Sequence, residues 1–205
     1  MRGLFITFEG PEGSGKSTHS RLLRNFLRKK GFKVLYTREP GGVTISEKIR
    51  HILLDPKNKG MDAVCEMLLY MAARAQIVKE KLIPALKKGN IVICDRFLDA
   101  TLVYQGYAGG IDVKLIRDMG RLVTAGVSPK ITFLLDIDAK KGLSRTGKTK
   151  DRIERKSLLY HKKVRRGYLT IARKEPRRMK VVSAVGKIDD TQKAIRRLVL
   201  KSMDV

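Results

Sequence analysis

Short apolar runs alternate with longer amphipathic stretches along the whole chain. Five of the runs are continuous and rich in β-prone residues, as is typical of strands buried in a parallel sheet. They cover residues 4–9, 33–37, 91–94, 131–136 and 179–183. Strands that alternate with helices form α/β folds. The pattern therefore predicts an α/β fold with a five-stranded, mostly parallel sheet and helices on both of its faces.

Helical periodicity fills the segments between these runs. Helices are expected over about 17–30, 45–54, 62–86, 99–106, 113–124, 151–174 and 189–200, with a short helix capped by Asp138. The longest of them has an apolar stripe that we expect to face the core. The stripe consists of Val64, Leu68, Met71, Ala75, Val78 and Leu82. Tyr70 and Arg74 lie one turn apart beside it, where a surface pair is the simplest interpretation and a nucleobase site the alternative.

The length of 205 residues fits one domain, 1–205. No apolar run approaches the ~20 residues that a membrane span needs. The first predicted strand begins so close to Met1 that no leader peptide is expected. We therefore expect a cytoplasmic protein with no membrane partner. Cys65 and Cys94 lie far apart and the three histidines lack metal-ligand spacing, so these residues predict no metal site.

The net charge of +25 is unusual, and residues 140–201 supply most of it, with 22 Lys or Arg against five Asp or Glu. Such a surface attracts polyphosphates and nucleic acids alike. The aromatic residues in that stretch, Tyr160 and Tyr168, are too few for a base-stacking platform. Charge alone therefore leaves both kinds of partner open.

Residues 10–18 fit the phosphate-binding pattern G-x-x-x-x-G-K-[ST] without a mismatch. They are Gly10, Pro11, Glu12, Gly13, Ser14, Gly15, Lys16, Ser17 and Thr18. A predicted strand precedes them and an amphipathic helix follows, which favours a nucleotide site over a chance glycine turn. Gly13 and Gly15 let successive N–H groups face one anion at the positive end of that helix. Lys16 would then reach the β- and γ-phosphates of ATP, and Ser17 would bind Mg²⁺.

Charged residues stand where two further predicted strands end, at the edge where open α/β sheets bind ligands. Arg38 follows the second strand, and Asp95 and Arg96 follow the third. Asp95 is expected to support Mg²⁺ and Arg96 to clamp a phosphoryl group, with a structural ion pair as the alternative. The next helix should add three side chains to that edge, those of Thr101, Tyr104 and Gln105.

The stretch 144–150 is polar, basic and contains glycine, a composition that is typical of loops. A basic flap that closes over phosphates can supply charge to the transition state and expel water. A solvated surface loop is an equally good interpretation of this stretch when it is considered alone.

Several motifs occur in a specific order and at specific distances. They are Phe8-Glu9-Gly10, Thr37-Arg38-Glu39-Pro40-Gly41-Gly42, Leu68-Leu69-Tyr70 with Arg74, Asp95-Arg96-Phe97, Tyr104-Gln105-Gly106 and Asp151-Arg152-Ile153-Glu154. With these motifs the chain resembles the thymidylate kinases, which phosphorylate dTMP with ATP. The resemblance covers nearly the whole chain. It implies the P-loop fold of nucleoside monophosphate kinases, as a single domain with a short lid at about 144–154, and a homodimer.

The resemblance also implies roles for the charged candidates. Lys16, Ser17 and the loop backbone would hold ATP and Mg²⁺, and Arg38 and Arg96 would grip the acceptor phosphate.

The family divides by whether its extra catalytic arginine lies in the phosphate loop or in the lid. The loop of this chain carries Glu12 instead of a basic residue, so the resemblance assigns the catalytic charge to Arg145, Lys148 and Arg152 of the lid. Glu12 itself would point toward the sugar 3′-hydroxyl of the acceptor.

Around the acceptor nucleoside, Tyr70 takes the place of a phenylalanine that stacks on thymine, and Arg74 that of the arginine at the base edge. This reverses the preference for a surface pair. The resemblance implies that Gln105 lies near the base and that Tyr104 crowds the 2′ position, which disfavours ribonucleotides. Thr101, where the family has asparagine or threonine, is also expected to bind the substrate.

The expected reaction is ATP + dTMP → ADP + dTDP, by direct in-line transfer without a covalent enzyme intermediate. One alternative is a P-loop kinase for another nucleotide or nucleoside, such as dUMP or a ribonucleotide. A second is a nucleic-acid-associated ATPase, which the basic final third motivates and which predicts hydrolysis stimulated by DNA or RNA. The acceptor-site motifs favour the kinase, so nucleic acid is not the expected partner.

Overall fold

Five parallel strands form one sheet at the centre of the computed structural model, which describes residues 3–147 and 149–203. The strands are β1 (Phe5–Glu9), β2 (Val34–Arg38), β3 (Ile91–Asp95), β4 (Ile131–Asp136) and β5 (Met179–Ser183). Their order across the sheet is β2-β3-β1-β4-β5, and each neighbouring pair is parallel. The predicted α/β fold with five strands is confirmed, and the sheet is entirely parallel.

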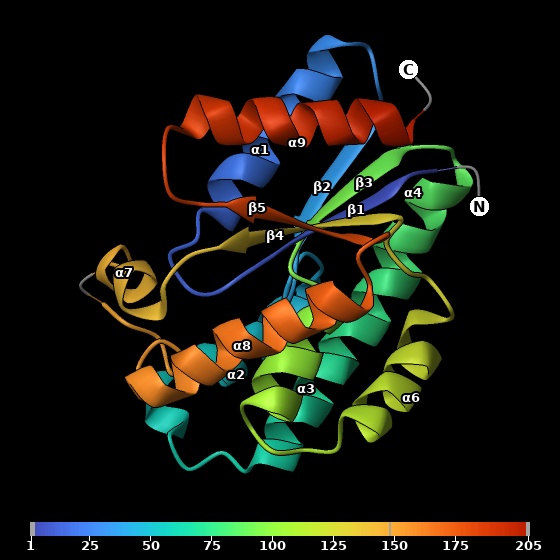
Figure 1. Cartoon of the computed structure of the whole chain (residues 1–205). Coiled ribbons are helices and arrows are strands. Elements are labelled where there is room, and N and C mark those ends of the chain that lie inside the picture. The colour runs from blue at the N-terminus through green and yellow to red at the C-terminus, as the bar shows by residue number, and fades with distance from the viewer. Residues whose placement is uncertain (1–2, 148, 204–205) are drawn as a thin grey trace.

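Helices cover both faces of the sheet (Figure 1). One face carries α1 (Lys16–Lys29) and α9 (Ile188–Ser202), and the other carries α3 (Ala63–Ile77), α4 (Ile83–Lys87), α6 (Val113–Thr124) and α8 (Leu158–Lys174). The shorter elements are α2 (Thr44–Leu54), which packs on α3, η1 (Pro56–Asn58), α5 (Leu98–Thr101) and α7 (Ala139–Ser144). Two π-helical segments, η2 (Val78–Leu82) and η3 (Leu102–Tyr107), continue α3 and α5.

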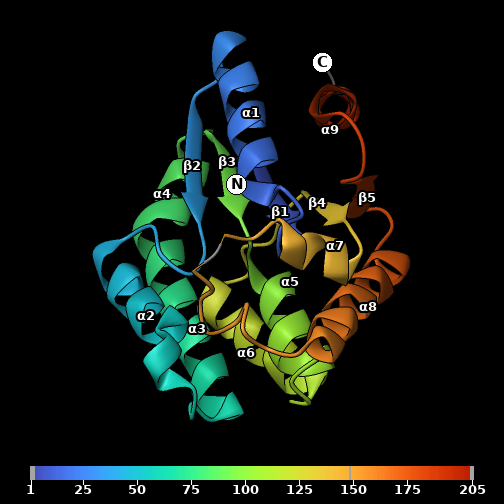
Figure 2. The ribbon, with the colours of Figure 1, turned by 90° about the vertical axis from the view of Figure 1, so that its left-hand side faces the viewer.

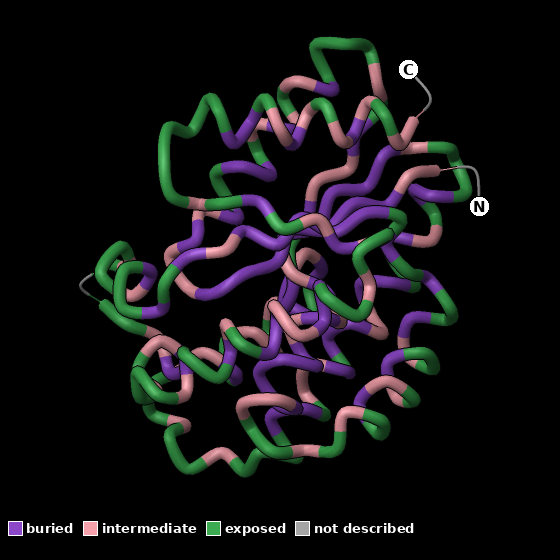
Figure 3. Tube along the Cα trace, in the orientation of Figure 1, coloured by how far each residue is buried: buried purple, intermediate pink, exposed green. Residues whose placement is uncertain are grey.

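Alternating side chains of the strands build the core on both faces of the sheet. Ile6 and Phe8 of β1 pack toward α1 and α9, whereas Phe5 packs with Cys94 and Phe97 on the opposite face. Figure 3 shows the consequence, because the strands are buried along most of their length and the outward turns of the helices are exposed. The core therefore lies in two layers that hold the strand ends in fixed positions.

The apolar stripe predicted on helix 62–86 is partly wrong. Val64 and Leu68 are 50% and 46% exposed, whereas the buried face of α3 includes Glu66 and Arg74. A pattern of apolar residues cannot reveal a buried face that carries a carboxylate and a guanidinium. The rest of the predicted stripe is correct in part, since Met71, Val78 and Leu82 are buried.

The helix predicted to begin at Asp151 begins instead at Leu158, where Ser157 Oγ accepts a hydrogen bond from the backbone N–H of Tyr160. The Asp151 carboxylate accepts from the backbone N–H groups of Ile153 and Glu154, at 2.8 and 2.9 Å. An aspartate that bonds the backbone two and three residues on stabilises a turn as readily as a helix start. The connection from α7 to α8 is consequently longer than predicted and reaches Ser157.

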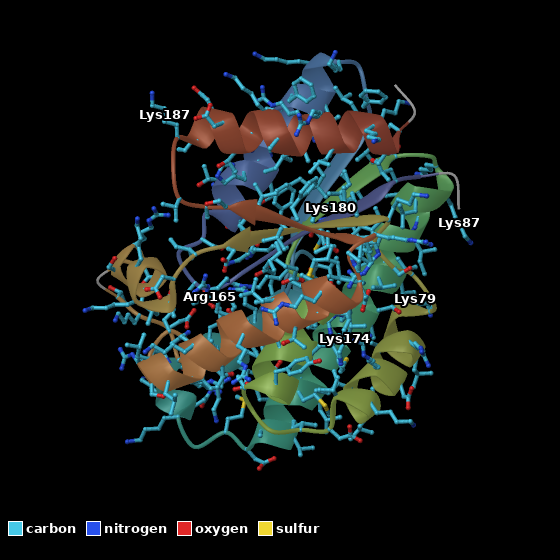
Figure 4. All side chains as sticks on the ribbon, viewed as in Figure 1. Lys79, Lys87, Arg165, Lys174, Lys180 and Lys187 are labelled. Carbon is cyan, nitrogen blue, oxygen red and sulfur yellow. The ribbon has the colours of Figure 1, made fainter. Side chains whose placement is uncertain are left out.

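Basic side chains project from many elements, and Figure 4 labels six of them. They are Lys79 on η2, Lys87 on α4, Arg165 and Lys174 on α8, Lys180 on β5 and Lys187 just before α9. The excess of positive charge is therefore spread over the surface and is not confined to one loop. Of the described helices, none is long and apolar enough to cross a membrane.

Candidate active site

The largest group of predicted site residues lines one cavity of about 360 Å³ at the carboxyl edge of the sheet. Figure 2 views the molecule from the side of α7, which lies at this edge. The candidates that line the cavity are Glu12, Gly13, Gly15, Lys16, Ser17, Thr18, Arg38, Tyr70, Arg74, Asp95, Arg96, Thr101, Tyr104 and Gln105. Gly10, Pro11 and Ser14 complete the phosphate loop behind them. Residues that lie up to 93 positions apart in the chain are thus brought together by the parallel strand order.

The phosphate loop turns sharply between β1 and α1. Gly13 and Gly15 have positive φ angles of 66° and 84°, a conformation that favours glycine. A Cβ atom at Gly13 would collide with the carbonyl oxygen of Gly142 in α7, and one at Gly142 would collide with the carbonyl oxygen of Glu12. The loop and α7 therefore touch backbone to backbone, which requires glycine on both sides.

Lys16 is folded back along this loop. Its Nζ donates hydrogen bonds to the carbonyl oxygens of Gly10 and Pro11, at 3.1 and 2.8 Å. Burial and the charge of Arg96 lower the pKa of Lys16 to about 8, although Glu12 and Asp95 pull in the opposite direction. The ammonium group is thus held at the anion-binding face of the loop, where it can pair with phosphate oxygens.

Ser17 and Asp95 stand side by side, because Ser17 Oγ donates a hydrogen bond of 2.5 Å to Asp95 Oδ2. A hydroxyl and a carboxylate are oxygen ligands of the kind that Mg²⁺ prefers. In the described part of the chain no cluster of three or more His, Cys, Asp or Glu side chains suits a metal ion. The donor set fits a magnesium ion that takes its remaining ligands from phosphates and water, as is usual in phosphoryl-transfer sites.

Glu12 is held by two donors on the other side of the loop. Its Oε1 accepts hydrogen bonds from Arg96 Nη2 and from the Tyr104 hydroxyl, each at 2.7 Å. Burial would raise the pKa of Glu12, but the charges of Arg96 and Lys16 outweigh it and lower that pKa to about 2. A carboxylate in an anion-binding loop is thereby neutralised by its own ion pair.

Arg96 itself is supported from behind by residues that the sequence did not single out for a role. It adopts a left-handed backbone conformation with φ 69°, which is unfavourable for a non-glycine residue. Its Nη1 donates to the Tyr168 hydroxyl at 3.2 Å, and that hydroxyl donates to Glu9 Oε2 at 2.7 Å. Burial and the nearby Asp99 raise the pKa of Glu9 to about 8. The sequence offered one sign of this supporting role, because Glu9 is a charged residue at the end of an apolar strand.

Arg74 is 1% exposed, so the surface pair first considered for Tyr70 and Arg74 is wrong. Its Nε donates to Glu39 Oε2 at 2.7 Å, and both terminal nitrogens lie 3.1 Å from Thr101 Oγ1. Burial raises the pKa of Glu39 to about 7, even though Arg74 opposes the shift. The guanidinium is thus fixed in the cavity wall, and half-buried Tyr70 lines the same wall.

Arg38 reaches the cavity from the end of β2 and is about half exposed. Its Nη2 contacts both carboxylate oxygens of Glu47, at 3.0 and 2.9 Å. Glu47 also accepts from the backbone N–H of Gly42 at 2.7 Å, which fixes the carboxylate against the turn. Arg38 is therefore oriented by its partner while its guanidinium stays accessible.

The predicted lid cations lie elsewhere. Of the described residues that line the cavity, none is Arg145 or Arg152. Arg145 is exposed and donates to the carbonyl oxygen of Ala184, at 3.2 Å. Arg152 is buried and forms an ion pair of 2.6 Å with Glu66. Lys148 lies outside the described residues.

The chain is similar to known proteins along most of its length. The family model of thymidylate kinase matches residues 8–195. Thymidylate kinase of Symbiobacterium thermophilum is 50% identical over 197 residues, which cover 96% of this chain and 92% of the relative. Thymidylate kinase of Geobacillus sp. (strain WCH70) is 48% identical over 194 residues, with 93% and 92% covered. The crystal structure of thymidylate kinase from Ehrlichia chaffeensis has a TM-score of 0.79 at 36% identity, and covers 96% of this chain and 98% of that one.

Proposed function

The chain belongs to the thymidylate kinase family and phosphorylates dTMP with ATP, and we propose that it does so in the cavity at the carboxyl edge of the sheet. The observation that carries the proposal is the meeting of Lys16 and the Ser17–Asp95 pair with the Glu12–Arg96 pair in one cavity. An ATPase needs only the residues that bind ATP and Mg²⁺, here Lys16 and the Ser17–Asp95 pair. A kinase also needs charged residues that bind its acceptor, a role that the Glu12–Arg96 pair can fill.

The donor half of the cavity is the phosphate loop, residues 10–18. Its backbone N–H groups and Lys16 bind the triphosphate, and Ser17 and Asp95 hold Mg²⁺. When bound, Mg²⁺ would neutralise part of the negative charge of the phosphates.

The acceptor half binds dTMP. Arg96 and Arg38 bind its phosphate, since both guanidinium groups line the cavity beside the loop. Tyr70 stacks on the base and Arg74 donates to its edge, with Thr101 beside it. Tyr104 crowds the 2′ position, and Glu12 accepts from the 3′-hydroxyl.

Transfer itself requires alignment and charge. The acceptor phosphate is already a nucleophile, so no strong base is needed, and one of its oxygens attacks the γ-phosphorus in line with the departing ADP oxygen. Lys16 and Arg96 stabilise the charge that develops between the two nucleotides. Arg145, whose guanidinium contacts the carbonyl oxygen of Ala184, supplies further charge when the lid closes. Arg152 is proposed to act with it, although its guanidinium is tied to Glu66.

Two neighbouring helices expose apolar side chains that suit a homodimer interface. Ile45 and Ile52 on α2 are 51% and 48% exposed, next to Val64 and Leu68 on α3. Such a patch on packed helices is typical of subunit contacts. We propose a homodimer formed by these helices, and a cytoplasmic location where nucleotides are made.

An acceptor panel tests the function. Purified protein is mixed with ATP, Mg²⁺ and one nucleoside monophosphate at a time, and both ADP and the diphosphate product are measured. We expect dTMP to be the best acceptor and 3′-deoxy-dTMP to bind more weakly, with no stimulation by DNA or RNA. Preference for another monophosphate, or hydrolysis driven by nucleic acid, would contradict the proposal.

A further inference from the structure

Glu66 is a buried carboxylate to which the proposed mechanism gives no role. It lies in the first turn of α3 and is 3% exposed. Its Oε1 accepts a hydrogen bond of 2.6 Å from Gln105 Nε2, and its Oε2 forms an ion pair of 2.6 Å with Arg152. Lys156 Nζ lies 3.5 Å from the same Oε2. One carboxylate therefore joins α3, the π-helical segment η3 and the connection from α7 to α8.

The bond to Glu66 decides which way round the Gln105 amide lies. An ionised carboxylate only accepts hydrogen bonds, and a side-chain amide has one donor end and one acceptor end. The NH₂ group of Gln105 must therefore face Glu66, and its carbonyl Oε1 is the end left for a ligand. Gln105 lines the same cavity as Tyr70 and Arg74.

The carboxylate is fixed in turn by the connection to α8. Arg152 Nε donates to the carbonyl oxygen of Leu53 at 2.7 Å, and the backbone N–H of Arg152 donates to that of Leu54 at 3.1 Å. These bonds anchor Arg152 to the last turn of α2. Arg152 thus links the Glu66 side chain of α3 to α2. Glu66 cannot rotate away from Gln105 without breaking this buried ion pair.

We propose that Glu66 is a positioning residue that selects the base of the acceptor through Gln105. With Oε1 presented, Gln105 accepts a hydrogen bond from a ring N–H, which thymine and uracil carry at N3. Cytosine has an unprotonated N3, so the lone pair of that nitrogen would face the Oε1 atom of Gln105, which is also an acceptor. The proposal rests on the proposed function, because it deepens the specificity of the same cavity.

The test compares dTMP, dUMP and dCMP as acceptors for the wild type and Glu66→Gln. An amide at position 66 can donate as well as accept, so it releases Gln105 to adopt either orientation. We expect the dTMP:dCMP ratio of kcat/KM to fall about tenfold, mainly through the KM of the acceptor, as for the loss of one oriented hydrogen bond. The dTMP:dUMP ratio should stay unchanged, because both bases carry the N3–H group.

Three further variants separate positioning from stability. Glu66→Asp keeps a charge for Arg152 but shortens the reach to Gln105, so it should lower the dTMP:dCMP ratio even if Glu66→Gln folds poorly. In a Gln105→Ala background, Glu66→Gln should change that ratio no further. Glu175→Gln is the matched control, since Glu175 pairs with Arg178 at 2.7 Å and does not line the cavity.

Two results would overturn the proposal. One is that the wild type prefers dTMP to dCMP and that both Glu66→Gln and Glu66→Asp keep the same dTMP:dCMP ratio of kcat/KM. The other is a fall in the dTMP:dCMP ratio that does not depend on the Gln105 amide. Such a fall would be equal with and without Gln105, or would be matched by an equal fall in the dTMP:dUMP ratio, and it would show that Glu66 acts on the fold alone. A wild type without activity on dTMP would instead refute the proposed function.

Discussion

The acceptor half of the cavity and Arg145 of the lid differ in how their polar side chains are held. Arg74, Arg96, Glu12 and Gln105 each contact at least one partner side chain, and Arg74 and Gln105 are almost wholly buried. Arg145 of the lid is exposed and contacts a backbone carbonyl. Discrimination between similar molecules depends on groups whose positions are fixed before binding. Charge for the transferring group can arrive after both substrates, when closure also excludes water.

Lys16 lines the cavity within the phosphate loop, and its loss should have the largest effect. Lys16→Ala is expected to lower kcat by about 10⁴-fold, because the charge lies where the phosphoryl group is transferred. The measurement is the steady-state rate with saturating dTMP. Lys79→Ala removes an exposed cation of η2 and serves as the control. A Lys16→Ala enzyme that folds and keeps most of its rate would refute the assignment of the loop.

Arg145 tests the lid side of the comparison. Arg145→Gln should lower kcat by about 10²-fold while the KM for dTMP stays nearly constant, because the lost interaction forms only in the transition state. Lys140→Gln, an exposed residue of α7, controls for the loss of one positive charge. If both variants behave alike, the lid is a solvated loop and the contrast between the two regions has no catalytic meaning.

The pH dependence of stability tests whether Glu12 of the acceptor half is held ionised by its partners. Its pKa of about 2 in the folded protein lies below the ordinary value of 4.5, so the unfolded chain binds more protons between these pH values. The stabilisation from ionised Glu12 is complete above about pH 4.5 and is lost as pH falls toward 2. Glu12→Gln lacks this contribution, which we expect to be on the order of 1–2 kcal/mol.

The measurement for Glu12 is urea unfolding at several pH values from 7 to 3. The difference in unfolding free energy between the wild type and Glu12→Gln should shrink as pH falls. Glu80→Gln, at an exposed position of η2, should stay within about 0.5 kcal/mol of the wild type. A difference that is constant with pH would mean that Arg96 and Tyr104 do not hold Glu12 ionised.

The strands and the phosphate loop were predictable because their signals are local. Five apolar runs match β1 to β5, and residues 10–18 carry a motif whose spacing follows from its own backbone geometry. The order of the strands was not predicted, since apolar runs of similar length do not encode which neighbour each will pair with. The start of α8 was missed because Asp151 stabilises a turn that the helical pattern could not distinguish from a cap.

The sequence predicted the candidate site residues that belong to motifs. It did not predict the buried residues that hold them in position. Glu9 and Tyr168 are 159 positions apart, and Glu66 is 39 positions from Gln105. Partners of this kind meet only after the sheet has assembled, so neither periodicity nor motif spacing reveals them. The burial of Glu66 and Arg74 also misled the prediction of the core face of α3.

The backbone contact between Gly13 and Gly142 has a consequence for the history of this protein. Neither position tolerates even a methyl group while the other backbone stays in place. A side chain at either glycine therefore requires the facing backbone to move first, because a change at the other glycine alone does not remove the collision. We therefore expect the phosphate loop and α7, from which the lid departs, to vary together, and changes in lid length to fall beyond α7.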